Sequence, residues 1–224
     1  MTDLPPAVRD LGRRLGADER CEHSTVRMKQ RGVMWQEPGA NPQAFQARQT
    51  MAIKATEFSW RARCGPLGSI SVIDYLGDGS FGVKVRLLGL IPLATLIDTP
   101  SVAKGETMRY LAELAWAPDA ILHNSSLRWR VIDGETFAVT SPARAPGSEV
   151  ILHLSSDGLI ASIDASDRPR IEGKAVVERP WRGVFSDYRV FAGRTVPAHG
   201  EVSWLLPAGA FKTWEGDITG WTLA

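Results

Sequence analysis

The sequence predicts a mainly β protein of the α+β class. We expect a strongly curved antiparallel sheet, or half-open barrel, of meandering hairpins with a central helix and a short N-terminal helix. Two observations lead to this prediction. Runs of alternating apolar and polar residues recur along most of the chain, joined by Gly- and Pro-rich turns that include Asp-Gly pairs at 78–79 and 133–134. One longer segment, 105–118, has helical spacing instead.

The N-terminal segment 5–15 is predicted to form a short amphipathic helix. Val8, Leu11 and Leu15 lie on its apolar side, and arginines dominate the other side. We expect this helix to pack as a lid against an edge of the sheet. With 224 residues the chain fits one large β domain, so residues 1–20 are assigned to the same domain as 21–224, which carries the central helix at 105–117.

Alternation in the first half predicts strands at 24–35, 45–53, 58–64, 69–76 and 81–88. In the fourth of these, Ile70, Val72, Asp74 and Leu76 share one face, because successive side chains of a strand point to opposite sides. Asp74 is therefore a carboxylate in an otherwise apolar row. The apolar segment 89–99 is interrupted by Pro92 and fits either a short helix or an edge segment.

The central helix has an apolar stripe formed by Met108, Leu111 and Ala115. Pro118 is expected to end the helix because a proline disfavours the helical conformation of the preceding residue. We expect the apolar stripe to pack against the sheet.

A second stripe of this helix is charged and consists of Glu106, Arg109 and Glu113. The interpretation that we favour is a solvated face, because exposed pairs at this spacing contribute only about 0.3–0.5 kcal/mol and are common. The alternative places Arg109 in a cavity, where its planar guanidinium would anchor an anionic head group and the two glutamates would orient it.

The second half predicts further strands and a polar, turn-rich loop at 166–173. The strands are expected at 124–132, 136–141, 149–154, 159–163, 174–178, 181–191, 201–206 and 211–214. The eight tryptophans of the chain fit two roles, the lining of an apolar concave face or ordinary filling of the core.

Composition argues against several classes of function. The 26 basic and 25 acidic side chains nearly cancel, whereas nucleic-acid binding needs clustered positive charge. No apolar run is long enough for an integral membrane span, and the N-terminus has no signal-peptide core, so a cytoplasmic location is the default expectation. Cys21 and Cys64 are expected to be reduced structural thiols.

No catalytic motif or metal-ligand spacing is present. The four histidines are scattered, neither cysteine belongs to a ligand pair, and no nucleophile elbow occurs. We therefore predict no metal site, no cofactor and no catalytic residue.

Several short motifs resemble a bacterial protein family without an established activity, and the likeness runs from about residue 35 to the end. The family is in turn similar in fold to the LolA and LolB lipoprotein carriers, whose curved sheet encloses a greasy cavity. The resemblance implies binding of a lipid or another hydrophobic ligand, although the secretion signal of the carriers is missing here. The motifs are FSW at 58–60, DG at 78–79, GETMRYLAE at 105–113 followed by Trp116 and Pro118, WRG at 181–183, GR at 193–194 before Pro197, and GEVSW at 200–204 followed by Gly209.

The leading hypothesis is non-catalytic binding of a lipid or other hydrophobic small molecule between the curved sheet and the central helix; the sequence leaves protein partners unknown. The ligand-binding candidates are Trp60, Asp74, Glu106, Arg109, Tyr110, Glu113, Trp116, Trp129 and Trp204.

Two alternatives remain. The first is an enzyme for a small anionic or amphipathic substrate that uses Asp74, Arg109 and Glu113. Against it, a buried carboxylate generally needs a partner, so we expect Asp74 to pair with Arg109 or a backbone amide and to stabilise the contact between sheet and helix. The second alternative is a structural or protein-interaction module that uses a sheet edge or the first helix.

Overall fold

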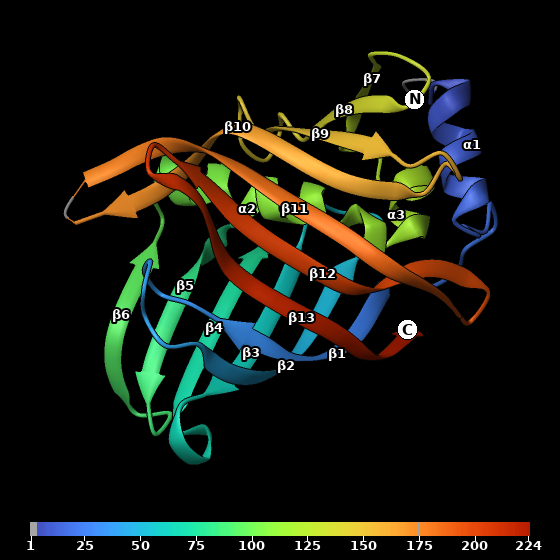
Figure 1. The fold of residues 1–224 in the computed structure, drawn as a ribbon. Coiled ribbons are helices and arrows are strands. Elements are labelled where there is room, and N and C mark those ends of the chain that lie inside the picture. The colour runs from blue at the N-terminus through green and yellow to red at the C-terminus, as the bar shows by residue number, and fades with distance from the viewer. Residues whose placement is uncertain (1–3, 174) are drawn as a thin grey trace.

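The computed structural model describes residues 4–173 and 175–224. In these residues, 13 antiparallel strands form one curved sheet that does not close, with the order β6-β5-β4-β3-β2-β1-β13-β12-β11-β10-β9-β8-β7 (Figure 1). Helices lie within the curve and at one end of it. The predicted fold class is confirmed.

The sheet consists of two meanders that meet where the two ends of the chain pair. The first runs outward through β1 (Thr25–Met34), β2 (Gln43–Ala52), β3 (Phe58–Cys64), β4 (Ile70–Gly77), β5 (Ser80–Leu87) and β6 (Ile91–Ile97), with the short helix η1 (Pro66–Gly68) between β3 and β4. The second returns from the other edge through β7 (Arg128–Val131), β8 (Thr136–Thr140), β9 (Glu149–Leu154), β10 (Ile160–Glu172), β11 (Ala175–Phe191), β12 (Arg194–Leu206) and β13 (Gly209–Leu223). Because β13 pairs with β1, the two meanders form one continuous surface.

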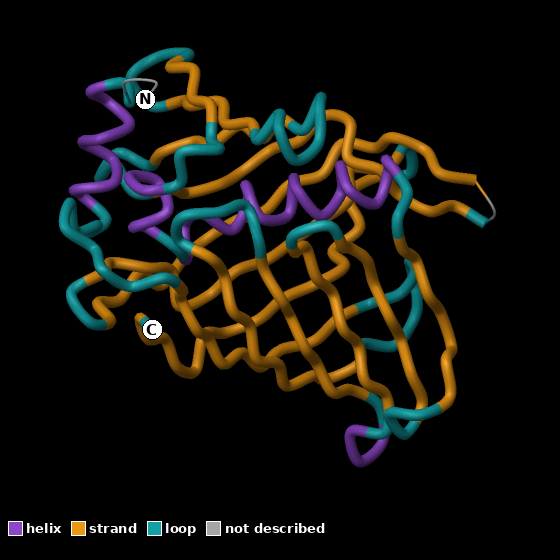
Figure 2. The backbone as a smooth tube through the Cα atoms, turned by 180° about the vertical axis from the view of Figure 1, so that it is seen from behind, coloured by secondary structure: helices purple, strands orange, loops and turns teal. Residues whose placement is uncertain are grey.

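The central helical segment connects the two outer edges of this sheet. It consists of α2 (Pro100–Ala112), the 3-10 turn η2 (Glu113–Trp116) and α3 (Pro118–His123). Because the chain must cross from β6 to β7, this segment runs across the curved sheet (Figure 2). The helix begins at Pro100 rather than at residue 105, since Thr99 caps it by accepting a 3.3 Å hydrogen bond from the amide of Val102. At the other end of the molecule, α1 (Pro6–Arg14) packs against α3 and β7.

The predictions for two irregular segments have different outcomes. The segment 89–99 contains the edge strand β6, which was one of its two expected forms. The loop predicted at 166–173 is wrong, because β10 continues to Glu172 across a bulge between Ala165 and Arg168. Arg168 and Arg170 in this segment pack on the rings of Trp181 and Trp204. A polar sequence can therefore form a strand, and the polarity of the segment did not indicate this packing. The strands predicted at 174–178 and 181–191 merge into β11, while residue 174 itself lies outside the described residues.

The concave side of the sheet encloses α2 so fully that both of its stripes are buried. Met108 and Leu111 have no exposed surface, as expected, but Glu106 and Glu113 are buried as well. The favoured interpretation of a solvated charged stripe is therefore wrong.

Cys21 and Cys64 are buried free thiols, as predicted. In the described part of the chain, no helix combines the length and the apolar character needed to cross a membrane.

Candidate functional site

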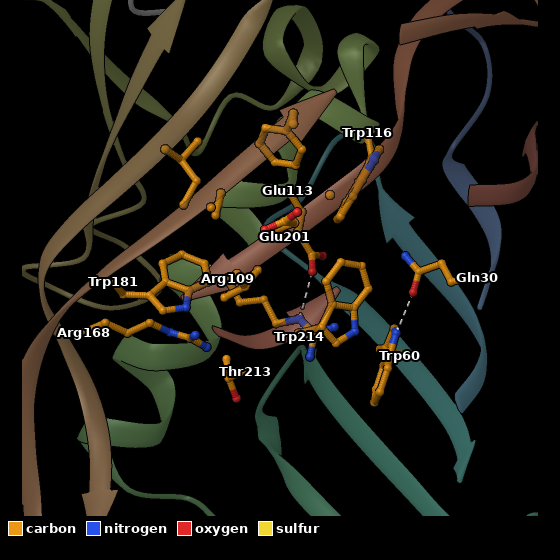
Figure 3. A pocket seen from close by; sticks show the side chains of 16 residues that line it. Gln30, Trp60, Arg109, Glu113, Trp116, Arg168, Trp181, Glu201, Thr213 and Trp214 are labelled. Atoms are coloured by element: carbon orange, nitrogen blue, oxygen red, sulfur yellow. Dashed lines mark hydrogen bonds and ion pairs between the residues drawn. The ribbon is translucent and has the colours of Figure 1, made fainter. Parts of the chain in front are cut away.

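A cavity of about 140 Å³ lies between the C-terminal part of the central helix and the concave face of the sheet (Figure 3). Its wall is mainly apolar and aromatic, with a few charged and polar groups. The lining residues are Gln30, Trp60, Arg109, Ala112, Glu113, Trp116, Ile163, Arg168, Trp181, Gly183, Phe185, Gly200, Glu201, Val202, Thr213 and Trp214. The two halves of the sheet and the central helix all contribute to this one wall.

Aromatic rings hold one another in place along this wall. The ring of Trp116 packs edge-on against Phe185, with 5.3 Å between centroids, and against Trp214 at 6.1 Å. The indole Nε1 of Trp116 donates a 2.9 Å hydrogen bond to the carbonyl of Pro197. Gly200 permits this approach, because a Cβ there would lie 3.0 Å from the Trp116 ring. Contacts within the protein itself thus fix the positions of these rings.

Arg109 is enclosed by two carboxylates and two rings. Its Nε donates to Glu113 at 2.9 Å, and its Nη1 forms an ion pair with Asp74 of β4, as predicted for that carboxylate. Its guanidinium also lies 5.1 Å from the ring centroids of Phe58 and Trp60. Burial opposes the charged form, but the carboxylates of Glu113 and Asp74 raise the pKa of Arg109. Arg109 is therefore a charged and internally neutralised group.

A chain of hydrogen bonds leads from the aromatic wall to the same network. Trp60 Nε1 donates to Gln30 Oε1 at 2.7 Å, and Gln30 Nε2 donates to Gln49 Oε1 at 2.9 Å. Gln49 Nε2 then donates to Glu113. Strand register produces this chain, because Gln49 lies opposite Trp60 and Trp60 lies opposite Asp74 on adjacent strands. Every N–H in it points toward the carboxylate of Glu113, so the chain stabilises that negative charge.

Glu106 lies about two turns before Glu113 on the central helix and differs from it in environment. Its Oε2 is buried without a hydrogen-bond partner among the described residues. Burial and, secondly, the neighbouring carboxylate of Asp74 raise the pKa of Glu106 well above its ordinary value. Its protonated, neutral form is therefore favoured.

Arg168 borders the cavity from β10, and its guanidinium is held by tryptophans rather than by acids. It lies 4.3 Å from the ring centroid of Trp181 and 5.5 Å from that of Trp204. Arg168 also lines a second cavity of about 340 Å³, which is formed by Val83, Thr95, Leu96, Ile97, Thr99, Ser101, Val102, Gly105, Glu106, Arg168, Pro169, Ile171 and Val176. The arginine thus lies at the boundary between two cavities.

The predicted ligand-binding residues fall into three groups. Trp60, Arg109, Glu113 and Trp116 line the first cavity. Asp74, Glu106 and Trp204 do not line it; Asp74 pairs with Arg109, Glu106 borders the second cavity, and Trp204 contacts Arg168.

The third group lies away from the cavity. The hydroxyl of Tyr110 donates to the carbonyl of Ala52 at 2.8 Å and accepts a hydrogen bond from Asn124 at 3.0 Å. Trp129 lines a separate depression beside α1 and α3. The sequence pattern gave no sign that Tyr110 and Trp129 lie away from the residues of the cavity.

Sequence reasoning missed five important residues of the site: Gln30, Gln49, Arg168, Trp181 and Trp214. Gln30 was detectable, since it continues the inward alternation of Val26 and Met28. Arg168 was not, because its segment was predicted to be a loop.

A cluster that shares Glu201 with the cavity wall contains metal-ligand atoms. His199, Glu201 and Glu215 bring such atoms within 4.8 Å of one another. The Lys212 ammonium already pairs with Glu215 at 2.5 Å and with Glu201 at 3.3 Å, and His199 bonds Asp217 at 2.9 Å. Both glutamates of the cluster therefore already share a cation of the protein, the ammonium of Lys212.

Comparison with known proteins gives a family and a fold. The model of a family described as "Family of unknown function (DUF6544)" matches residues 1–216. A search of curated proteins found no match.

Two solved structures resemble the chain over nearly its whole length. A LolA superfamily protein from Nitrosomonas europaea is 10% identical with a TM-score of 0.51, and the match covers 97% of this chain and 93% of that one. A DUF1329 family protein from Desulfovibrio piger is 14% identical with a TM-score of 0.52, covering 99% of this chain and 94% of that one. These similarities show a LolA-like fold, as the sequence motifs implied.

Proposed function

The chain belongs to the DUF6544 family, and we propose that it is a non-catalytic protein that binds a lipid chain or another hydrophobic ligand. The observation that carries the proposal is the preformed cavity of about 140 Å³ between α2 and the concave sheet. Concave, mostly apolar sites with a few converging polar groups are typical of small-molecule binding.

The composition of the wall supports an apolar ligand. Trp60, Trp116, Trp181 and Trp214 supply large rigid surfaces around the cavity. Burying a ligand group the size of a leucine or phenylalanine side chain there is favourable by about 1.5–3 kcal/mol. Affinity would therefore come mainly from removing apolar surface from water.

The volume limits what fits. An apolar cavity of similar volume, about 150 Å³, is sufficient to bind benzene. The cavity here thus accommodates one ring or part of one acyl chain, whereas a two-chain lipid would require the sheet and helix to move apart. We propose a ligand with one buried apolar group.

The acid–base groups favour binding over catalysis. The enzyme hypothesis expected Asp74 and Arg109 to be displayed together in a cleft, but their side chains are only 10% and 17% exposed and pair with each other. Glu113 is likewise engaged by Arg109 and Gln49. These carboxylates are thus occupied by groups of the protein itself rather than displayed to a substrate.

The test combines a search for a natural ligand with a titration. Native mass spectrometry of freshly purified protein, followed by solvent extraction, would reveal a co-purified hydrophobic molecule. Binding of 1-octanol to the delipidated protein can be followed by tryptophan fluorescence, because four indoles surround the cavity.

A matched pair of variants locates the binding. Ala112→Leu places extra carbon atoms in the cavity and is expected to weaken octanol binding about tenfold, the equivalent of about two methylene groups of the ligand that are no longer buried. Ala103→Leu makes the same change on α2 outside the cavity lining and should bind normally. Absence of both a co-purified molecule and octanol binding would reject the proposal.

A further inference from the structure

Arg168 differs from the other arginine of the cavity in lacking a carboxylate partner. In residues 4–173 and 175–224, no carboxylate forms an ion pair with Arg168, and its Nε is buried without a hydrogen-bond partner. Arg109, by contrast, contacts two carboxylates. A buried N–H without an acceptor is costly, so an anion that accepts from Arg168 would gain more here than at a site whose donors are already paired.

The acids of β10 and of the facing strand β11 that lie near Arg168 are paired with other cations. Asp167 and Glu178 both accept from Lys104, at 2.6 and 2.7 Å. Glu172 forms a two-bond pair with Arg179, with both distances 2.9 Å. These contacts leave the positive charge of Arg168 available to a ligand.

Among the residues that the structure describes, three acids line the two cavities that Arg168 borders. Glu113 and Glu201 line the first cavity and pair with Arg109 and Lys212, and Glu106 lines the second. Burial and the carboxylate of Asp74 favour the neutral form of Glu106. With Glu106 protonated, the carboxylates of Asp74 and Glu113 together match the two guanidinium groups in charge. Both carboxylates contact Arg109 directly, whereas neither forms an ion pair with Arg168.

The orientation of Arg168 also suits a ligand. Trp181 and Trp204 lie at stacking distance from its guanidinium, which restrains the group without occupying all its N–H donors. A carboxylate or phosphate can accept two of these donors at once. The apolar wall that begins beside the guanidinium would hold the rest of such a molecule.

We infer that Arg168 binds the anionic head group, a carboxylate or phosphate monoester, of a single-chain amphiphile whose apolar part occupies the tryptophan-lined cavity. This inference rests on the proposed function and specifies the class of its ligand. It assigns the head group to Arg168 rather than to Arg109, which the sequence suggested as the anchor.

The experiment compares eight-carbon probes that differ only in the head group. Octanoate, octyl phosphate, 1-octanol and octylammonium are titrated into delipidated protein at pH 7 by calorimetry. Octanoate or octyl phosphate should bind about 10- to 100-fold more tightly than octanol, as expected for a charge-assisted hydrogen bond in a desolvated site, and octylammonium more weakly than octanol. Which anion binds identifies the head group.

Variants of two neighbouring arginines test the assignment. Arg168→Gln should reduce the affinity for the anion to that for octanol, whereas Arg168→Lys should retain part of the preference. Arg170→Gln is the matched control, because Arg170 lies on the same strand and stacks on Trp204 but lines neither cavity. Thermal unfolding by circular dichroism checks that each variant is folded.

The possible failures are distinct. Equal affinity for octanoate, octyl phosphate and octanol, or equal loss in the Arg168→Gln and Arg170→Gln proteins, would overturn the inference and leave the proposed function intact. Absence of binding by every octyl probe would count against both. Binding of inorganic phosphate with the same affinity as octyl phosphate would overturn the amphiphile assignment, since the chain would then contribute nothing.

Discussion

Arg109 and Arg168 border the same cavity but lie in opposite electrostatic environments. On the helix side, Arg109 is surrounded by Asp74, Glu113 and a chain of amides. On the strand side, Arg168 is surrounded by indole rings. Arg109 therefore belongs to the scaffold, whereas Arg168 is the arginine that we assign to the ligand.

The difference originates in backbone periodicity. A helix places residues four apart on one face, so Arg109 has Glu113 as a built-in partner. On β10, a bulge precedes Arg168, and the adjacent Asp167 is directed to Lys104 on α2. Arg168 therefore has no acid from its own strand.

The largest effect is expected from removal of the neutralised arginine. Arg109→Met leaves the buried carboxylates of Asp74 and Glu113 without their cation, so the free energy of unfolding should fall by about 3–5 kcal/mol. Denaturant unfolding measures this change. The control is Arg182→Met, which breaks a largely exposed pair with Asp164 and should cost less than about 1 kcal/mol. Equal losses in the two variants would contradict the scaffold role of Arg109.

A smaller effect is expected in the amide chain that supports Glu113. Gln49→Leu leaves an oxygen of Glu113 and the Nε2 of Gln30 without their partner, which should lower the free energy of unfolding by about 2 kcal/mol. Gln46→Leu changes an exposed glutamine of the same strand and should stay within about 0.5 kcal/mol of the wild type. A Gln49 variant as stable as the control would show that the chain contributes nothing.

The pH dependence of stability tests the protonation of Glu106. Since its pKa is raised in the folded protein, the folded state binds more protons than the unfolded state above about pH 4.5, the usual value. The wild type should therefore lose stability as pH rises through the folded-state pKa, by at most about 1.4 kcal/mol per pH unit from this group.

Glu106→Gln removes this titration, so its advantage over the wild type should grow from pH 5 to pH 8. Chemical denaturation at several pH values measures the trend, with the exposed Glu135→Gln as control. Parallel stability profiles for wild type and Glu106→Gln would mean that Glu106 is ionised in the folded protein.

The smallest effect on stability is expected at Arg168. Replacing an arginine without a carboxylate partner by the apolar Arg168→Met should change the free energy of unfolding by no more than about 1 kcal/mol, or increase it. Thermal and denaturant unfolding of Arg168→Met and Arg109→Met under the same conditions compare the two losses of stability directly. A loss as large as that of Arg109→Met would erase the distinction between the two arginines.

Local patterns in the sequence determined much of the architecture. Alternation and Asp-Gly turns located most strands, and helical spacing located α2 and brought Arg109 next to Glu113. The apolar row of β4 correctly indicated that Asp74 points inward to a cation. These features follow from the periods of strand and helix, which can be counted along the chain.

Only the tertiary structure decided which faces are enclosed and which side chains meet. The charged stripe of α2 is buried because this helix joins the two edges of a curved sheet, which surrounds it. The same curvature brings Trp181 and Arg168 to the cavity and leaves Trp129 outside it. A periodic pattern specifies the side of an element on which a residue lies, but the curvature of the whole sheet determines what faces that side.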